Sequence, residues 1–166
     1  MSPVNPVSTA GTVHNESGRH QRRPVALVTG ATSGIGLAVA RDLAADHDLV
    51  LLARTTTDLA ELASVLGEET GSRVRTCAVD LTDDEALAVA VGELNLTRLD
   101  VLVNSAGVEA AGALEELSPA QWRSVLDLDL VAVAHLTGLL LPALRETRGL
   151  VVMINSGAGL RAWPRQ

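Results

Sequence analysis

Tyrosine, phenylalanine and lysine are all absent from this 166-residue sequence, and its 13 basic residues are all arginine. Cysteine is almost absent as well, because Cys77 is the only one. A single cysteine excludes an intrachain disulfide and is typical of proteins in a reducing compartment. We therefore predict a cytoplasmic protein, with Cys77 as a small buried residue of a strand.

Excess positive charge, long apolar runs and clustered histidines are also lacking. The formal net charge is −7 and the isoelectric point is about 5.0, which excludes bulk electrostatic attraction to nucleic acid. No uninterrupted apolar run approaches the ~20 residues of a membrane span, so we expect a soluble protein with no membrane association. The four histidines show no metal-ligand spacing, and no metal site is expected.

Two segments of different composition make up the chain. Residues 1–23 are rich in serine, proline and asparagine and have no helical or strand periodicity, which predicts a disordered tail. Residues 24–166 are long enough to bury a substantial core and form a single predicted domain. Trp122 and Trp163 are expected to be packing anchors of that domain.

Five short apolar runs predict the strands of this domain. Four of them start at residues 25, 49, 74 and 99, which are 24 to 25 residues apart, and the fifth starts at residue 150. That spacing fits one strand plus one crossover helix, and mostly apolar strands are typical of a sheet covered on both faces. The pattern predicts an α/β fold with right-handed βαβ units and a Rossmann-like, doubly wound parallel sheet of five strands.

The segments between these runs carry helix signals. Thr82 with Glu85, and Ser118 with Gln121, are capping-box pairs, and Pro119 follows the second cap at the first helical position. Two apolar stripes at helical spacing are expected to face the core. Their members are Ile35, Ala38, Val39 and Leu43 on the first helix, and Leu126, Leu130, Val133, Leu136 and Leu140 on a longer helix over residues 120–147.

A glycine-rich turn, TGATSGIG, follows the first predicted strand directly at residues 29–36. Its three glycines let the backbone approach a ligand closely, and the free N–H groups and positive end of the next helix favour a pyrophosphate. Taken alone, such a turn has a second explanation, because glycine also serves tight turns and close helix packing. The spacing G-x-x-x-G-x-G also differs from the G-x-G-x-x-G of many dinucleotide-binding folds.

Further motifs follow the turn in a fixed order. Asp80 in VDLTD ends the third run, and the sequence Asn-Ser-Ala-Gly follows the fourth at residues 104–107. Together with TGATSGIG, they resemble the cofactor site of the short-chain dehydrogenase/reductase family, and the resemblance covers residues 24–166. It implies that Asp80 contacts the adenine ring, whereas alone this residue would equally be a carboxylate capping a turn. The implied cofactor-binding residues are Gly30, Thr32, Ser33, Gly34, Ile35, Gly36, Arg54, Asp80, Leu81, Asn104, Ala106 and Gly107.

The end of the second run indicates which cofactor is preferred. Family members that prefer NAD commonly have an acidic residue there, which accepts hydrogen bonds from ribose hydroxyls. Ala53 offers no carboxylate, and Arg54 is a permanent cation able to pair with a 2′-phosphate. We therefore expect NADP (NADPH) to be favoured over NAD, the alternative being that Arg54 is a surface arginine without a contact. Ser33 weakens this expectation slightly, because some NADPH users have a second basic residue at that position.

The resemblance also implies catalytic positions. Ser156 in INSGAG matches the family serine that orients a substrate carbonyl, and Asp129 falls where the family has an asparagine. A carboxylate cannot donate as an amide can, so a buried, unpaired Asp129 would have to be protonated or have altered surroundings. The family's Tyr-x-x-x-Lys, in which tyrosine is the general acid, has no counterpart in this sequence. We therefore expect a truncated chain that lacks the C-terminal helix and strands of the family.

Three functions remain open at this point. The leading one is an oxidoreductase that transfers hydride between NADPH and a small carbonyl or alcohol substrate, present as an incomplete chain. The second is a non-catalytic NADP-binding sensor, and the third is a non-functional remnant with an exposed fifth strand. A homo-oligomer stays open, but a defined dimer is not expected, since the resemblance implies a dimer contact that includes the missing helix.

Overall fold

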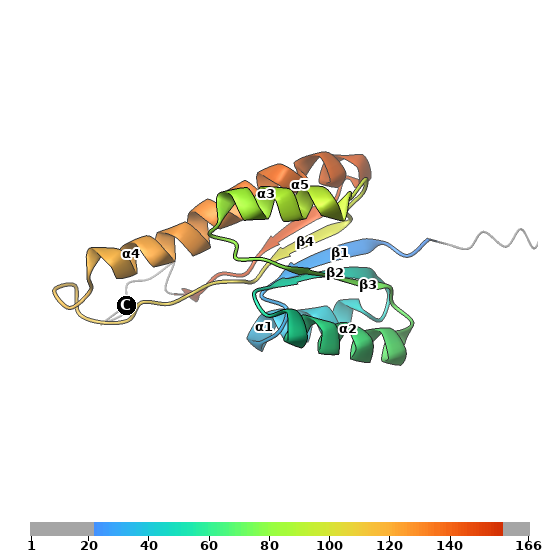
Figure 1. Cartoon of the computed structure of the whole chain (residues 1–166), viewed down its shortest axis with the longest axis horizontal. Coiled ribbons are helices and arrows are strands. Elements are labelled where there is room, and N and C mark those ends of the chain that lie inside the picture. The colour runs from blue at the N-terminus through green and yellow to red at the C-terminus, as the bar shows by residue number, and fades with distance from the viewer. Residues whose placement is uncertain (1–21, 158–166) are drawn as a thin grey trace, which may run out of the picture.

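Five parallel strands form one sheet in the computed structural model of the chain, which describes residues 22–157. The strand order is β3-β2-β1-β4-β5 (Figure 1), so the chain builds outward from β1 first to one edge and then to the other. This arrangement confirms the doubly wound α/β fold predicted from the spacing of the apolar runs. The strands are β1 (Val25–Thr29), β2 (Asp48–Ala53), β3 (Val74–Ala78), β4 (Val101–Asn104) and β5 (Leu150–Met153).

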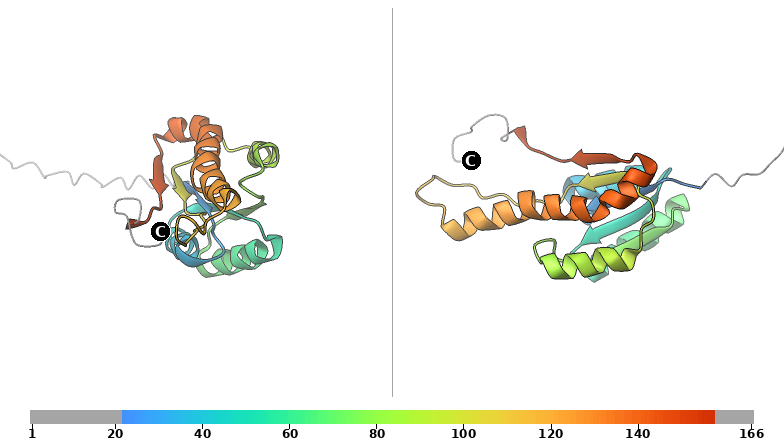
Figure 2. Two further views of the ribbon diagram at one scale, coloured as in Figure 1. Left: turned by 90° about the vertical axis from the view of Figure 1, so that its left-hand side faces the viewer. Right: turned by 90° about the horizontal axis from the view of Figure 1, so that it is seen from above.

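Helices cover both faces of the sheet. Figure 1 shows α1 and α2 on one face, and α3 and α5 on the opposite face. One long helical segment contains α4, a π-helical turn η1 and α5, and its first half extends beyond the sheet (Figure 2). The bounds are α1 (Gly34–Leu43), α2 (Thr56–Thr70), α3 (Asp84–Leu94), α4 (Pro119–Leu126), η1 (Asp127–Ala132) and α5 (Val133–Thr147).

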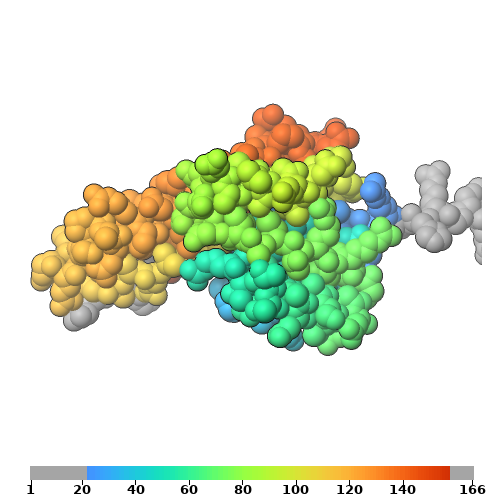
Figure 3. All heavy atoms as spheres, in the orientation of Figure 1, coloured from blue at the N-terminus to red at the C-terminus, as the bar shows by residue number. Residues whose placement is uncertain are grey.

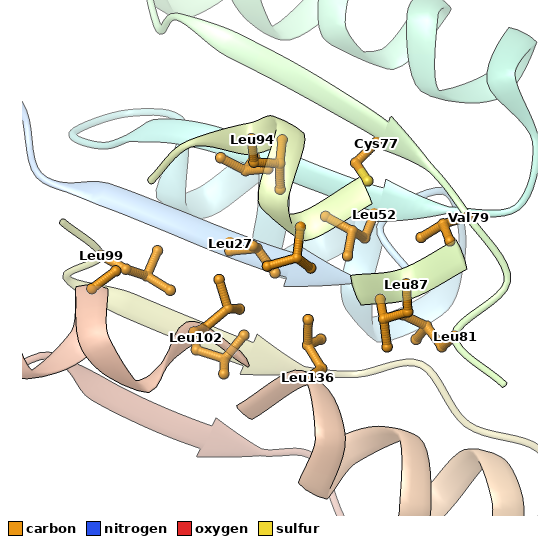
Figure 4. Packing of buried hydrophobic residues seen from close by; sticks show 14 of the residues in the cluster. Leu27, Leu52, Cys77, Val79, Leu81, Leu87, Leu94, Leu99, Leu102 and Leu136 are labelled. Atoms are coloured by element: carbon orange, nitrogen blue, oxygen red, sulfur yellow. The ribbon is translucent and has the colours of Figure 1, made fainter. Parts of the chain in front are cut away.

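Two buried clusters hold these layers together. The cluster between the sheet, α3 and α5 includes Leu27 and Leu102 from central strands and Leu136 from α5 (Figure 4). The other cluster joins the sheet to α1 and α2. Cys77 is buried in the first cluster, as predicted. Burial raises the pKa of its thiol, Glu93 adds to the rise and Arg75 opposes it, so the thiol is a packing group rather than a nucleophile.

The first helix faces the sheet with only part of the predicted stripe, because Val39 and Leu43 pack against the core cluster while the other two members do not. Ile35 is 59% exposed and Ala38 is exposed, whereas Gly36 and Ala40 are buried. The reason is the close approach of α1 to the turn after β1, because a Cβ at Gly36 would overlap the backbone oxygen of Gly30. Small residues therefore occupy the fully buried positions of α1, Val39 and Leu43 pack beside them, and the larger apolar side chain of Ile35 is exposed.

The two predicted helix caps had different outcomes. Ser118 and Gln121 form the expected capping box, with Pro119 at the start of α4. The cap of α3 is Asp83 and not Thr82, because the Asp83 carboxylate accepts from the backbone N–H of Ala86. Thr82 instead donates its hydroxyl to Asp80 at 2.8 Å, which holds it in the turn before the helix.

The long helical segment is buried only where it crosses the sheet. Leu136 and Leu140 of α5 are buried, but the predicted core residues Leu126 and Leu130 are 50% and 61% exposed. Trp122 is likewise 44% exposed and is not the predicted packing anchor; Trp163 lies outside the described residues. These residues precede the sheet-covering part of the helix, so they have no layer to pack against (Figures 1 and 2).

By length and composition alone, the segment Pro119–Thr147 is apolar enough to cross a membrane. The segment is not an uninterrupted apolar run, because His135, Thr137 and Pro142 lie within its apolar stretch. In the fold, the second half of this segment supplies core residues and only a small part of the apolar stretch is buried. The absence of membrane association therefore stays a prediction.

Strand β5 lies at the edge of the sheet and is poorly covered. It pairs with β4 alone, with Leu102 opposite Val151. Leu150 and Met153 at its two ends are 59% and 51% exposed. The apolar edge expected for the fifth strand is therefore present in the described part of the chain.

Candidate functional site

A cleft of about 850 Å³ opens where the strands end. In parallel α/β sheets, ligands bind outside the carboxyl ends of the strands, next to the point where the strand order reverses. Here that point lies between β1 and β4. In the space-filling view, α4 and the loop before it project from the body of the molecule (Figure 3). The cleft is lined by residues 30 and 32–35 after β1, 52–55 at the end of β2, 79–82 after β3, 105–111 after β4, and 121, 124, 127 and 128 of α4 and η1.

The turn after β1 brings bare backbone to the floor of the cleft. Gly30 has φ +63°, and a Cβ added there would lie 3.0 Å from the backbone of Ala106, so only glycine fits without strain. Ser33 precedes the first residue of α1 and makes no side-chain cap bond, which leaves the N–H groups of the first turn facing outward. Such a helix start, aimed at a cleft, is suited to an anion. Gly36 does not line the cleft and serves the packing of α1 instead.

Thr29 ties the turn after β1 to the loop after β4. Its buried hydroxyl accepts hydrogen bonds from the backbone N–H groups of Ser105 and Ala106, both at 3.0 Å. The two backbone segments that line the cleft are therefore held in a fixed relation. We did not select Thr29 from the sequence, although its place directly before Gly30 at the end of a strand was the available signal.

Arg54 and Asp80 both line the cleft, at the ends of neighbouring strands. Asp80 accepts from the backbone N–H of Thr82 at 2.9 Å and from its hydroxyl at 2.8 Å. These two hydrogen bonds lower the pKa of the Asp80 carboxyl, slight burial opposes them, and the positive charge of Arg54 adds to the lowering. The cleft thus contains a permanent cation and an ionised acceptor at neutral pH. Leu81 lines the cleft beside them.

The Asn-Ser-Ala-Gly turn divides into two parts. Ala106 and Gly107 line the cleft, as expected, together with Ser105. Asn104 does not, because it is only 4% exposed and its amide nitrogen lies 3.4 Å from the Thr137 hydroxyl and 3.3 Å from the Met153 sulfur. The amide therefore joins β4 to α5 and β5, and its position supports the site without contacting the cleft.

Asp129 lies in the π-helical turn η1 and is exposed. Its carboxylate accepts a hydrogen bond from the backbone N–H of Val108 at 3.0 Å and lies next to Gly107. A π-helical turn often marks a functional position in a helix. The buried, unpaired charge considered from the sequence is therefore not formed, and Asp129 fixes the loop that lines the cleft.

Ser156 follows β5 and is exposed, and its backbone N–H donates to the Asn155 side chain at 2.7 Å. It is not among the residues that line the cleft. The predicted loop over residues 159–166 lies outside the described residues. Within residues 22–157, no group of three or more histidine, cysteine, aspartate or glutamate side chains could hold a metal ion.

Several residues of the cleft were not selected from the sequence. They include Thr55 and Thr82, Val108 and Glu109, and Gln121, Ser124, Asp127 and Leu128. Those after β4 are in a loop without a motif. Those on α4 and η1 come from a helix whose position over the cleft depends on tertiary packing, so no local pattern distinguishes them from a solvent-exposed helix face.

Comparison with known proteins assigns this chain to a family. Residues 24–166 match the short chain dehydrogenase family. Nodulation protein G of Rhizobium sp. (strain N33) is 38% identical over 144 residues, which are 85% of this chain and 58% of that protein. Sulfoacetaldehyde reductase 2 of Chromohalobacter salexigens is 34% identical over 144 residues, 84% of this chain and 56% of that protein.

Solved structures agree with the sequence comparison. An alcohol dehydrogenase from Thermococcus sibiricus, complexed with 5-hydroxy-NADP, superposes with a TM-score of 0.82 at 32% identity, covering 86% of this chain and 62% of that one. L-sorbose reductase from Gluconobacter frateurii, complexed with NADPH and L-sorbose, gives a TM-score of 0.79 at 32% identity, covering 87% and 57%. The chain thus spans less than two thirds of the length of these relatives. The fold, the strand-end cleft and the match over residues 24–166 together show that this chain belongs to the short-chain dehydrogenase/reductase family of oxidoreductases.

Proposed function

We propose that this chain forms the NADP(H)-binding part of an oxidoreductase that transfers hydride between NADPH and a small carbonyl or alcohol substrate. The observation that carries the proposal is that one cleft brings together the glycine-rich turn, Arg54 and Asp80. Its support from relatives is that the T. sibiricus and G. frateurii enzymes were solved with NADP-type ligands. When bound, the cofactor supplies the hydride.

The residues of the cleft fit such a cofactor. Gly30 keeps the floor free of side chains, and the outward N–H groups at the start of α1 suit a pyrophosphate. Arg54 suits a 2′-phosphate, which NAD lacks, and the ionised Asp80 suits the amine of adenine. In this proposal Asp129 positions the loop at Val108 beside the cofactor, and Ser156 orients a substrate carbonyl.

Exchange of Arg54 for alanine tests the cofactor assignment. We expect Arg54→Ala to weaken binding of NADPH by about 10- to 100-fold, because a charge-assisted hydrogen bond to phosphate is lost. Binding of NADH should weaken by less than about threefold. Dissociation constants are measured from nucleotide fluorescence with the purified chain. Arg73→Ala is the matched control, since Arg73 is an exposed arginine that does not line the cleft. Equal losses for NADPH and NADH would rule out the 2′-phosphate contact.

A second candidate function is a non-catalytic NADP-binding protein. It is favoured by Asp129, which stands at the position of the family asparagine. The two candidates share the cofactor and differ in turnover. Binding of NADPH without reduction of any carbonyl compound, by the protein at its natural length, would favour this second candidate.

A further inference from the structure

The cleft has two sides of different chemical character. On the side of α1 and α2, the glycine-rich turn and Arg54 present N–H groups and a positive charge. The opposite side is formed by the segments that lead into α3 and α5, because these two helices cover the other face of the sheet (Figure 1). Asp80 and Asp127 lie in these segments and line the cleft. A phosphate is therefore favoured on the first side, and a hydrogen-bond donor on the second.

Asp127 differs from the other polar residues of its wall in having no partner. The Gln121 side chain accepts from the Ser118 backbone within the capping box, and the Ser124 hydroxyl donates to the backbone oxygen of Gln121. Glu109 also has a partner of its own. No hydrogen bond or ion pair joins the Asp127 carboxylate to another residue of the described part of the chain. Asp127 is thus an exposed acceptor left available to whatever fills the cleft.

A ligand in the cleft removes water from this carboxylate. The loss of hydration is costly unless the ligand returns hydrogen bonds, and an approaching phosphate would be repelled. Within an adenine nucleotide, the exocyclic amine of the base carries two N–H donors. One can serve Asp80 from the β3 side and the other can serve a second acceptor. Leu128, beside Asp127 in the wall, provides apolar surface for the ring itself.

We propose that Asp127 accepts a hydrogen bond from the exocyclic amine of adenine, so that Asp80 and Asp127 together select an adenine base. This inference rests on the proposed NADP(H) function and adds a base-selectivity residue to it. Hypoxanthine, which carries an oxygen in place of the amine, would present an acceptor to two carboxylates. The unmatched acceptors make that base unfavourable in the same cleft.

The test compares NADPH with its analogue that carries hypoxanthine in place of adenine. Dissociation constants of both are measured by calorimetry with the purified 166-residue chain, its Asp127→Asn variant and an Asp42→Asn control. Asp42 is an exposed carboxylate on α1 that does not line the cleft. We expect the unmodified chain to bind NADPH about 30-fold more tightly than the hypoxanthine analogue. In Asp127→Asn this ratio of dissociation constants should fall by about 10-fold. The control should keep the full preference.

The outcomes separate this inference from the function on which it rests. If NADPH binds and the preference for adenine stays within twofold in Asp127→Asn, the inference is wrong while the cofactor assignment stands. If the unmodified chain binds neither nucleotide, the proposed function and this inference both fall. Asp127→Ser repeats the comparison with a smaller side chain, and circular dichroism checks that each variant is folded. The preference for NADPH over NADH should be unchanged in both variants, because it depends on Arg54.

Discussion

Gly36 is the residue at which the backbone of the cofactor turn and the first helix come closest. A Cβ there would overlap the backbone oxygen of Gly30, and backbone cannot move aside as a flexible side chain can. We therefore expect Gly36→Ala to lower the free energy of unfolding by about 3 kcal/mol and to weaken NADPH binding, because the turn must shift. Urea denaturation followed by circular dichroism measures the first effect.

Gly92 of α3 is the matched control for that substitution. It is a helical glycine with no atom within 4 Å of a Cβ added there. Gly92→Ala should raise the free energy of unfolding by about 0.5–1 kcal/mol, because alanine is the better helix former. If both substitutions changed stability in the same direction, the close contact at Gly36 would not be what sets the residue type there.

At the residue scale, sequence reasoning found the side chains that belong to a motif. Arg54 and Asp80 stand at strand ends, and the glycine-rich turn follows a strand, so the fold class alone places them at one edge of the sheet. Asp127 was not selected, since a single aspartate within a helical segment has no distinguishing pattern. Its position in the cleft depends on how α4 and η1 pack, which is a tertiary property.

At the scale of elements, Arg23 joins the ends of two helices. Its guanidinium donates to the backbone oxygen of Ala44 after α1 at 2.6 Å and to that of Thr70 at the end of α2 at 3.3 Å. A cation at two helix carboxyl ends satisfies unpaired carbonyls and complements both helix dipoles. We expect Arg23→Met to lower the free energy of unfolding by about 1–2 kcal/mol, measured by denaturant titration.

Arg22 provides the comparison for Arg23. It is adjacent in sequence but exposed, so Arg22→Met should leave stability within about 0.5 kcal/mol. Similar losses in both variants would mean that net charge, and not the helix-end contacts, is responsible. Arg23 was assigned to the N-terminal tail from the sequence, because a contact between residues 47 positions apart leaves no local signal.

Strands were predicted more closely than helix faces and caps, for a physical reason. The observed strands lie within two residues of the predicted runs, because the central strands β1, β2 and β4 are buried and so must be apolar over most of their length. The cap of α3 was misplaced because Thr82 and Asp83 are both good caps, and the hydrogen bonds of Thr82 to Asp80 decide between them. The stripe on α1 was right for Val39 and Leu43 and wrong for Ile35, because Gly36 allows closer packing at the start of the helix than a periodic pattern of large residues suggests.

At the scale of the whole molecule, the order of the strands could be predicted from their spacing and from the handedness of the crossovers. The exposure of several apolar residues could not be predicted from the sequence. Regular 24- to 25-residue intervals and right-handed crossovers leave few other parallel arrangements. The exposed apolar residues of α4, η1 and β5 have the same helical or strand periodicity as core residues, so the sequence pattern predicts that they are buried. The three-dimensional structure is needed to show that α4, η1 and β5 are not packed against a second layer of the fold.

Catalysis depends on groups of the whole molecule and not on the cleft alone. The 166 residues supply the groups proposed to hold a cofactor, but no tyrosine to protonate a substrate oxygen, and a missing general acid typically costs about 10²- to 10⁴-fold in rate. We therefore expect the purified chain to bind NADPH without catalysing its oxidation. The rate of NADPH oxidation by simple aldehydes or ketones, followed by absorbance, should equal the rate measured without protein. Turnover above that level, abolished by Ser156→Ala, would instead show that Ser156 and the bound cofactor suffice for hydride transfer.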